Sequence, residues 1–466
     1  MTLDAPPPPV STMRRDIVSA YLASGMKVAS WAVVMGMVYR IIHVGAVDLI
    51  SIFVLARGTL GLLNYTTLGL APAIIHLLAK AKHHTPRRVI PASEPDAVLS
   101  YRRDEQFDIT LPEKIRDNAV MLSLLIGVFG FVAVIFYAAF FPQIHHLSGP
   151  VPGTTDQVVS MLGFGIVMRL VSDSCGAVLQ TEGYIFVDNL LLAAADLFWV
   201  VAALLVSDHF VLMTDTAATL FTWSSALLLV LRGMVTHKLV GLRVRTSCLD
   251  FAVIGSLLSF GLFATFAQLA DFLYAPTDFL LINHLLRLDL IAVYAPAVQI
   301  DSGLLLVVTA IAMVLLPKSA VAHASGDRRR LRQYYVRGTA ASTGLLIIAA
   351  GVVYFICPWI FKVWLDDPMP ATQTILPLIL IHTVVGGSSA VGRSILLGMG
   401  KVKPFTVAVL VAGVSNVVLS CVFVQFFGLG LRGIVLGTIC AVVGRCAIWQ
   451  PWYVWKCLKQ NATTPQ

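Results

Sequence analysis

Charge is scarce in this sequence. Only 12% of its 466 residues are charged, whereas 58% are hydrophobic and the mean hydropathy is +0.83. Soluble domains carry about 25% charged residues, so this composition excludes an ordinary soluble globular protein. We predict an all-α polytopic membrane protein.

The residue patterns of metal and redox sites are also missing. The seven cysteines are scattered, mostly within apolar runs, and no CxxC pair occurs. The eleven histidines show neither HxxxH nor HExxH spacing. We therefore expect no disulfide framework, no zinc or other metal site, and no cofactor.

Long apolar runs dominate what remains. A membrane span needs about 20 mostly apolar residues, and by that rule the sequence contains about twelve spans. They lie near residues 22–44, 49–78, 118–141, 157–180, 184–206, 216–236, 250–285, 289–317, 337–360, 372–397, 404–427 and 432–455. The seventh contains Pro276, which should kink or break a helix.

Most lysines and arginines outside the spans lie in alternate loops. They gather near residues 14–15, 80–116, 238–245, 318–337, 401–403 and 456–459, whereas loops 141–156 and 207–215 have none. The positive-inside rule makes the basic loops and both termini cytoplasmic. Membrane topology then explains most of the net charge of +8, and we expect no nucleic-acid partner.

The predicted spans divide into two halves. Residues 1–15 are predicted to be a disordered cytoplasmic tail, 16–248 an N-terminal six-helix bundle, 249–455 a C-terminal six-helix bundle and 456–466 a second tail. The segment DLISIFVLARG, from Asp48, weakly resembles DLIAVYAPAVQ, from Asp289. Equal halves of the same orientation favour parallel repeats with a central site between them.

One cytoplasmic loop is longer than a simple connector. Residues 80–116 form a cytoplasmic insertion of mixed charge and few apolar residues. Two interpretations remain open: a partly ordered contact for glycosyltransferases or anionic headgroups, and plain disorder.

Arg57 is the most unexpected residue of the second span. A charge at a helix centre costs about 2.5–3.5 kcal/mol on insertion scales, so such side chains usually face a partner or a wet cavity. Arg57 lies about eight residues from the outer end of its span, or about 12 Å deep. Asn64 shares its helical face. We expect this face to line a cavity.

The fourth span has a longer polar face. In MRLVSDSCGAVLQ, the residues Arg169, Asp173 and Gln180 lie along one side of a helix. Two interpretations remain open for Arg169: an i,i+4 ion pair with Asp173, and contact with an anionic substrate in a cavity. Both can hold in different states of the protein.

Further polar residues occur within other spans. Asp271, Asp278 and Asp301 either pair with arginines of other helices or build a cation or proton site beside the Pro276 break. The weaker cavity candidates are Lys27, Asp173, Asp196, His382, Arg393 and Arg445. Among the basic residues near cytoplasmic ends, Lys27, Arg232 and Arg393 could instead extend to the interface. His382 is either an interior histidine whose ring nitrogens are hydrogen-bonded within the protein or part of a proton relay.

Five segments resemble the MOP superfamily of exporters, and within it the Wzx-like polysaccharide or O-antigen flippases. They are FVLARGTLGLLNYTTLGLAPAIIHLL, IAVYAPAVQIDSGLLLVVTAIAMVLLPKSA, HASGDRRRLRQYY, LLGMGKVKP and GLGLRGIVLGT. The resemblance implies a V-shaped pair of six-helix bundles in the bacterial inner membrane, alternating between inward- and outward-open states. Members move undecaprenyl-diphosphate-linked oligosaccharides to the outer leaflet, often coupled to Na⁺ or H⁺.

The resemblance also implies roles and partners. Arg57 and Arg169, with Asn64 and Gln180, would bind the anionic headgroup, because a guanidinium matches phosphate oxygens. Ion coupling would use Asp271, with Asp278, Asp301 and Asn416 as further candidates. The acid that some relatives carry on the eleventh span is absent, since VSNVV offers Ser415 and Asn416. The expected partners are the lipid-linked oligosaccharide, the bilayer and polysaccharide-assembly proteins, around a monomeric transporter.

Two other functions were weighed against this hypothesis. A MATE-like drug or cation antiporter would have the same fold but an acidic or aromatic cavity, which Arg57 and Arg169 disfavour. A membrane-embedded polymerase, ligase or glycosyltransferase would need a substantial outer loop or an exposed catalytic constellation, which the short outer loops lack. We therefore expect a transporter and not an enzyme.

Overall fold

The chain is almost entirely helical wherever the structure describes it. This computed structural model describes residues 13–61, 63, 70–71, 73–75, 77–78, 111–147, 152–241, 250–259, 275–324 and 326–460. Within these ranges the one extended feature is an isolated bridge between Asp208 and Val211. The predicted all-α polytopic fold class is confirmed.

The N-terminal bundle contains helices from the first half of the chain. They are α1 (Met13–Tyr39), the short 3₁₀ turn η1 (Arg40–Val44), α2 (Val47–Leu60), α6 (Leu111–Ile144), α7 (Pro152–Thr181), α8 (Ile185–Val206) and α9 (Thr214–Val240). Helix α7 packs along α6, α9 and α2, and α1 packs along α8.

The C-terminal bundle repeats this arrangement with more interruptions. Its elements are α11 (Ala275–Leu285), α12 (Leu290–Ala324), α13 (Arg328–Leu365), α14 (Pro370–Ser388), α15 (Ala390–Gly398), α16 (Val402–Gln425), α17 (Gly430–Val442), the π-helical η3 (Val443–Trp449) and α18 (Gln450–Gln460). Pro276 lies in the first turn of α11. Proline is tolerated there because the backbone N–H groups of a first turn have no intrahelical acceptor, so the N–H that proline lacks is not missed.

Most of the predicted spans coincide with helices long enough to cross a membrane. Within the described ranges nine segments meet that criterion, and the apolar part of α12, Leu290–Leu306, is a shorter tenth. Helices α14 and α15 together form one span, as do α17, η3 and α18. The predicted spans 49–78 and 250–285, and the insertion 80–116, fall partly or mostly on residues outside the described ranges.

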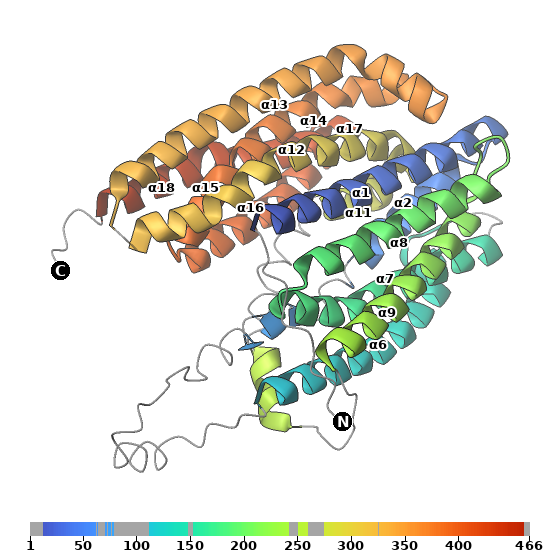
Figure 1. The fold of residues 1–466 in the computed structure, drawn as a ribbon. Helices are drawn as coiled ribbons and strands as arrows, with labels where there is room; N and C mark the ends of the chain where they lie inside the picture. The colour runs from blue at the N-terminus through green and yellow to red at the C-terminus, as the bar shows by residue number, and fades with distance from the viewer. Residues whose placement is uncertain are drawn as a thin grey trace, which may run out of the picture.

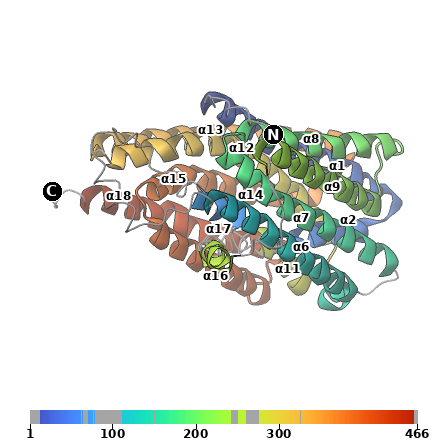
Figure 2. The same cartoon turned by 60° about the horizontal axis from the view of Figure 1, so that its bottom comes forward.

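The two bundles meet at one end and diverge toward the other. Figure 1 shows the blue and green N-terminal bundle separating from the yellow-to-red C-terminal bundle toward the side of the C-terminus. Helices α1 and α2 lie beside α11, α12 and α13, and Figure 2 shows the same two sets from below. At the diverging end lie the start of α1, the end of α9 and the start of α13. Because these helix ends contain Arg15, Lys238 and Arg328, we call it the basic end.

Contacts between the bundles concentrate at the opposite end, where α6, α8 and α13 finish. We call it the outer end, because the positive-inside rule predicts that it faces away from the cytoplasm. Tyr39 Oη donates to the carbonyl of Ala292 at 3.0 Å. Trp364 Nε1 donates to the carbonyl of Ala32 at 2.6 Å. Asn283 Nδ2 donates to the carbonyl of His145 at 3.2 Å. The outer end is therefore closed by direct hydrogen bonds between bundles.

Candidate functional site

Arg57 lies in the last turn of α2 and is held by an aromatic ring. Its Cζ atom lies 3.6 Å from the ring centroid of Trp31 on α1. Its guanidinium forms no hydrogen bond or ion pair with any residue that the structure describes. The arginine therefore keeps its charge and its N–H donors for another partner.

Lys27, one turn before Trp31 on α1, lies in the same region. Its side chain is exposed, and it forms no ion pair within the described part of the chain. The charges that act on it are those of Arg57, Arg169, Asp173 and Asp196. We call these five residues the N-bundle charge cluster.

Arg169 is firmly paired within that cluster. Its Nη2 atom lies 2.7 Å from Asp196 Oδ1 on α8. It also donates to two serines of α9, from Nε to Ser225 Oγ at 3.1 Å and from Nη2 to Ser224 Oγ at 3.2 Å. The expected i,i+4 pair between Arg169 and Asp173 is wrong, because both groups find closer partners on other helices.

Asp173 instead pairs with Arg232 of α9. Arg232 is only 2% exposed, and its guanidinium lies 2.8 Å from both Asp173 Oδ1 and Asp188 Oδ1. The expectation that Arg232 extends to the interface is wrong, because Asp188 on α8 holds it inside the bundle. Gln180, expected at the headgroup, donates to Asp188 Oδ2 at 2.8 Å.

A second polar centre lies in the C-terminal bundle around Asp278 of α11. This carboxylate is 0% exposed and accepts hydrogen bonds from Tyr294 Oη at 2.8 Å, Thr438 Oγ1 at 2.9 Å and Asn416 Nδ2 at 3.1 Å. These donors come from α12, α17 and α16. All three of these donors are neutral groups.

The oxygens around Asp278 outnumber the available protons. Thr438 has one O–H, yet Asp278 Oδ2, Asn416 Oδ1 and the carbonyl of Ile434 all lie within hydrogen-bond distance of it, at 2.9, 2.9 and 3.2 Å. Only one of them can accept that proton at a time. A bound proton or small cation would relieve the remaining oxygen–oxygen contacts.

Asp301 of α12, in the lining of the same cavity as Asp278, contacts two residues of α14. It accepts from Thr383 Oγ1 at 2.6 Å and lies 3.6 Å from His382 Nδ1, both on α14. His382 is thus paired with a carboxylate, and both earlier interpretations of it remain open.

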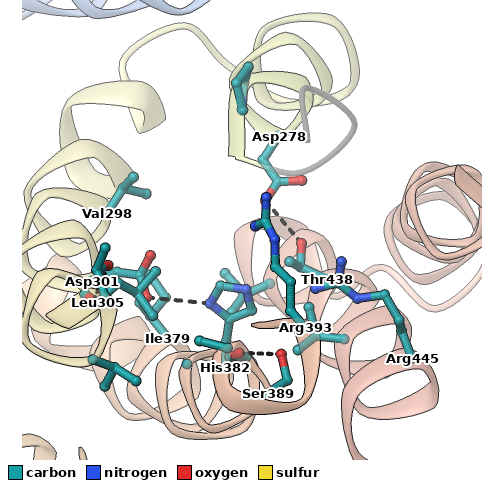
Figure 3. Close-up of a pocket in the computed structure, with 18 of the residues that line it drawn as sticks. Asp278, Val298, Asp301, Leu305, Ile379, His382, Ser389, Arg393, Thr438 and Arg445 are labelled. Carbon is teal, nitrogen blue, oxygen red and sulfur yellow. Dashed lines mark hydrogen bonds and ion pairs between the residues drawn. The ribbon is translucent and has the colours of Figure 1, made fainter. Parts of the chain in front are cut away.

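One cavity of about 340 Å³ connects these groups. Asp278, Asp301 and His382 line it together with Arg393 of α15 and Arg445 of η3 (Figure 3). Figure 3 shows the Arg393 side chain extending toward Asp278. Arg445 lies in the π-helical segment, a distortion often found at functional sites. Within the described ranges, no three His, Cys, Asp or Glu side chains are placed to hold a metal ion.

Two predicted site residues cannot be placed. Asn64 and Asp271 lie outside the described residues. Conversely, sequence reasoning missed Trp31, Asp188 and Thr438. Asp188 could have been found from the sequence. It lies in the first turn of an apolar helix, where a carboxylate usually requires a polar or cationic partner. Trp31 and Thr438 are ordinary in membrane helices, and only the fold shows their contacts.

Comparisons with known sequences match parts of the chain. The MatE family model matches residues 264–422. An uncharacterized membrane protein of Bacillus subtilis (strain 168), EpsK, is 25% identical over 213 residues, or 45% of this chain and 42% of that protein. The chain thus aligns with less than half of that relative's length.

Solved structures match over nearly the whole chain. An inward-facing multidrug resistance MATE transporter of the MOP superfamily has a TM-score of 0.69 at 14% identity, over 96% of both chains. An outward-facing one has a TM-score of 0.63 at 15% identity, over 97% of both chains. A MOP superfamily transporter from Pyrococcus furiosus Vc1, described as having a binding pocket of reverse polarity, has a TM-score of 0.59 at 13% identity, over 97% of this chain and 100% of that one. The chain therefore has the fold of the MATE transporters of the MOP superfamily, with a MatE segment at residues 264–422.

Proposed function

We propose that this protein is a bacterial inner-membrane flippase that moves a lipid-linked oligosaccharide with a diphosphate headgroup to the outer leaflet by alternating access. The observation that carries the proposal is the pair Lys27 and Arg57, two cations of the N-bundle charge cluster without a carboxylate partner in the described chain. A diphosphate crossing a membrane needs such compensation, and arginine matches phosphate oxygens with a planar fork.

The balance of charge in the N-terminal bundle supports an anionic cargo. Arg169 is neutralised by Asp196, and Arg232 lies between Asp173 and Asp188. Four cations thus accompany three carboxylates, and the excess positive charge lies at Lys27 and Arg57. A group of charges with this sign attracts an anion and repels an organic cation.

The arrangement of the bundles supports loading from the basic end. The chain superimposes better on the inward-facing MATE transporter than on the outward-facing one. Its inter-bundle hydrogen bonds lie at the outer end. We assign the basic end and both termini to the cytoplasm by the positive-inside rule, so the cargo enters from the cytoplasmic leaflet.

The Asp278 centre is the proposed site of the coupling ion. Its carboxylate, the amide oxygen of Asn416 and the hydroxyl of Thr438 provide hard oxygen ligands for Na⁺, and the same carboxylate can carry H⁺. A buried carboxylate with only neutral donors is unfavourable unless a proton or cation accompanies it. Of the expected ion-coupling residues, Asp278 is the one that the proposal uses, while Asp271 lies outside the described residues.

A second candidate is a cation-coupled exporter of organic cations. The observation in its favour is the C-bundle cavity, which has two carboxylates, Asp278 and Asp301, in its lining. That cavity also contains Arg393 and Arg445, which lessen its attraction for a cation.

The deciding experiment is complementation of a bacterial strain that lacks its own flippase, at matched membrane expression, with the lipid-linked oligosaccharide measured on each leaflet. Arg57→Ala and Lys27→Ala should each retain cargo on the cytoplasmic leaflet and lower the flipping rate about 10–100-fold, since a charged hydrogen bond contributes about 1.5–3 kcal/mol. Arg57→Lys should recover part of the rate. Lys238→Ala, at the exposed basic end of α9, is the matched control.

The two candidate functions give opposite results. Wild-type activity in both alanine variants, together with Asp278-dependent extrusion of a cationic dye, would replace the flippase with the exporter. Because a foreign glycan can be rejected, the strain should express the glycan of the host in which the gene occurs.

A further inference from the structure

Arg57 is held by a contact that leaves its hydrogen-bonding groups unused. An ion pair with a carboxylate would occupy two N–H groups and cancel the charge. A guanidinium over an aromatic face keeps all five N–H donors and its full charge, while the electrostatic attraction fixes the position of its plane. The distance of 3.6 Å from Cζ to the Trp31 centroid is well inside the range of about 6 Å for this interaction.

Trp31 is itself fixed by three other rings. Trp199 of α8 meets it edge to face at 4.6 Å, Phe221 of α9 lies at 5.4 Å and Phe53 of α2 at 6.3 Å. Trp199 is anchored in turn, because its Nε1 donates to the carbonyl of Ala217 at 3.1 Å. We call these four rings the aromatic platform. Three of them are almost completely buried and the fourth, Trp31, is 7% exposed.

The platform holds both arginines of the charge cluster, but in different ways. Arg169 lies over Phe221 at 4.8 Å and is also fixed by Asp196 and two serines. Arg57 has Trp31 alone. Removing the ring should therefore release Arg57 and leave Arg169 in place.

We infer that Trp31 is the positioning residue of Arg57: its fixed face orients the guanidinium so that the N–H donors point to the diphosphate headgroup. This inference rests on the proposed function, since it assigns the partner of those donors. Trp31 touches no phosphate itself and acts through Arg57.

The test uses the purified full-length protein in detergent, with farnesyl diphosphate as the probe. Trp31→Leu should weaken probe binding about tenfold, because a desolvated cation–π contact contributes about that much. Trp31→Phe keeps a ring and should retain most of the affinity. In an Arg57→Ala background, Trp31→Leu should have no further effect, since a residue acting through Arg57 is not additive with it. Trp223→Leu, at a tryptophan that is 65% exposed, is the control for losing an indole.

A second readout does not depend on the probe. Phenylglyoxal modifies exposed guanidinium groups, and peptide mass spectrometry reports the rate for each arginine. Trp31→Leu should raise the rate at Arg57 at least about twofold, with Trp31→Phe and the rate at Arg169 near wild type, because only Arg57 loses its sole contact.

The outcomes separate this inference from the proposed function. Unchanged probe affinity and unchanged Arg57 modification in Trp31→Leu would overturn the positioning role, even if Arg57→Ala abolishes binding. If Arg57→Ala leaves probe affinity unchanged, the headgroup site and the role of Trp31 in it both fail. Additive losses in the double variant would assign Trp31 to bundle packing and overturn the inference.

Discussion

Arg57 and Arg232 are arginines of the same bundle with opposite environments. Arg57 has an aromatic ring and no acid, whereas Arg232 lies between Asp173 and Asp188 and is 2% exposed. A paired buried arginine stabilises a particular arrangement of helices, and an unpaired one can serve a ligand. The difference assigns Arg232 to structure and agrees with the binding role proposed for Arg57.

Removing Arg232 should destabilise the protein far more than removing Arg57. Arg232→Met keeps much of the side-chain volume but leaves the carboxylate of Asp188, which is 0% exposed, without a cation. Breaking a buried pair from one side costs about 3–5 kcal/mol. The melting temperature in detergent should fall clearly for Arg232→Met and little for Arg57→Met.

The partner variant makes this prediction specific. In the double variant Arg232→Met with Asp188→Asn, no buried carboxylate is left uncompensated at that position, so much of the lost stability should return. Equal melting temperatures for Arg232→Met and Lys238→Met would contradict the structural role, since Lys238 is exposed.

The sequence predicts which charged residues lie within the spans, but it does not predict which residues they pair with. The depth of Arg57 in an apolar span was enough to expect a cavity or a ligand. The partner of Arg169 was not predictable, because Asp173 and Asp196 are both acids on polar helix faces. Only the packing of α7 against α8 and α9 brings Asp196 to Arg169 and leaves Asp173 to Arg232.

Among the helices, hydropathy located the spans better than their ends. Helices α6 and α13 begin at Leu111 and Arg328, before their apolar windows at 118 and 337, because a helix continues into water where its backbone hydrogen bonds and caps allow. Asp327 provides such a cap by accepting from the Arg330 N–H at 3.0 Å. The π-helical segment of the last span has no hydropathy signal, since its residues are as apolar as those of a regular helix.

The closed outer end depends on a close approach of α1 and α13 at Gly36. A Cβ atom on Gly36 would lie 2.6 Å from the Trp364 side chain and 2.8 Å from its carbonyl oxygen. Gly36→Val should therefore push the helices apart and open the outer end. Opening of this end can be measured as the maleimide reactivity of a Leu286→Cys variant without other cysteines, because Leu286 lines the pocket at that end.

We expect this thiol to react several-fold faster with Gly36→Val. The matched control is Gly351→Val on α13, where an added Cβ meets nothing within 4 Å. Unchanged reactivity with Gly36→Val, or an equal increase with both variants, would mean that this contact does not hold the outer end closed.

For the molecule as a whole, the number and orientation of the spans predict two halves and the resemblance implies a V-shaped pair of bundles; the fold comparisons confirm a polytopic helical protein with the fold of MATE transporters. Composition and periodicity alone predict a polytopic helical protein. They do not predict which helices of the two bundles meet, because those contacts join residues at least 138 positions apart, such as Tyr39 and Ala292, or His145 and Asn283. The same reason hides the histidine contact at the outer end.

That contact places a buried histidine between the bundles. His145 follows the last residue of α6. Its Nε2 atom lies 2.9 Å from Tyr137 Oη, and its Nδ1 atom lies 3.4 Å from Asn283 Nδ2 of α11. An amide N–H beside Nδ1 fits a neutral ring with its proton on Nε2. Burial, together with the nearby imidazoles of His284 and His146, lowers the pKa of His145 to about 4. The carboxylates of Asp48 and Asp156 line the adjoining pocket.

Acidification should therefore loosen the outer end. The pKa of a free histidine is about 6.5, so the closed state binds fewer protons than a separated or unfolded state between pH 6.5 and pH 4. The stabilisation is complete above pH 6.5 and is lost as the pH falls toward 4. At pH 5 the loss should be about 1–2 kcal/mol after allowing for solvent screening at this end.

Two measurements report this loss. One is the melting temperature in detergent at pH 7.5 and pH 5. The other is the maleimide reactivity of Leu286→Cys at the same two pH values, corrected for the change in the thiolate fraction of the cysteine with pH. His145→Gln has no ionisable ring and can still accept from Asn283 or Tyr137, so both readouts should become nearly independent of pH over this window. Ser207→Gln, on the exposed turn after α8, controls for a new amide at the outer end, because it leaves His145 in place. A pH dependence that is the same in wild type and His145→Gln would assign the titration to the neighbouring His146, His284, Asp48 or Asp156 and not to the contact between bundles.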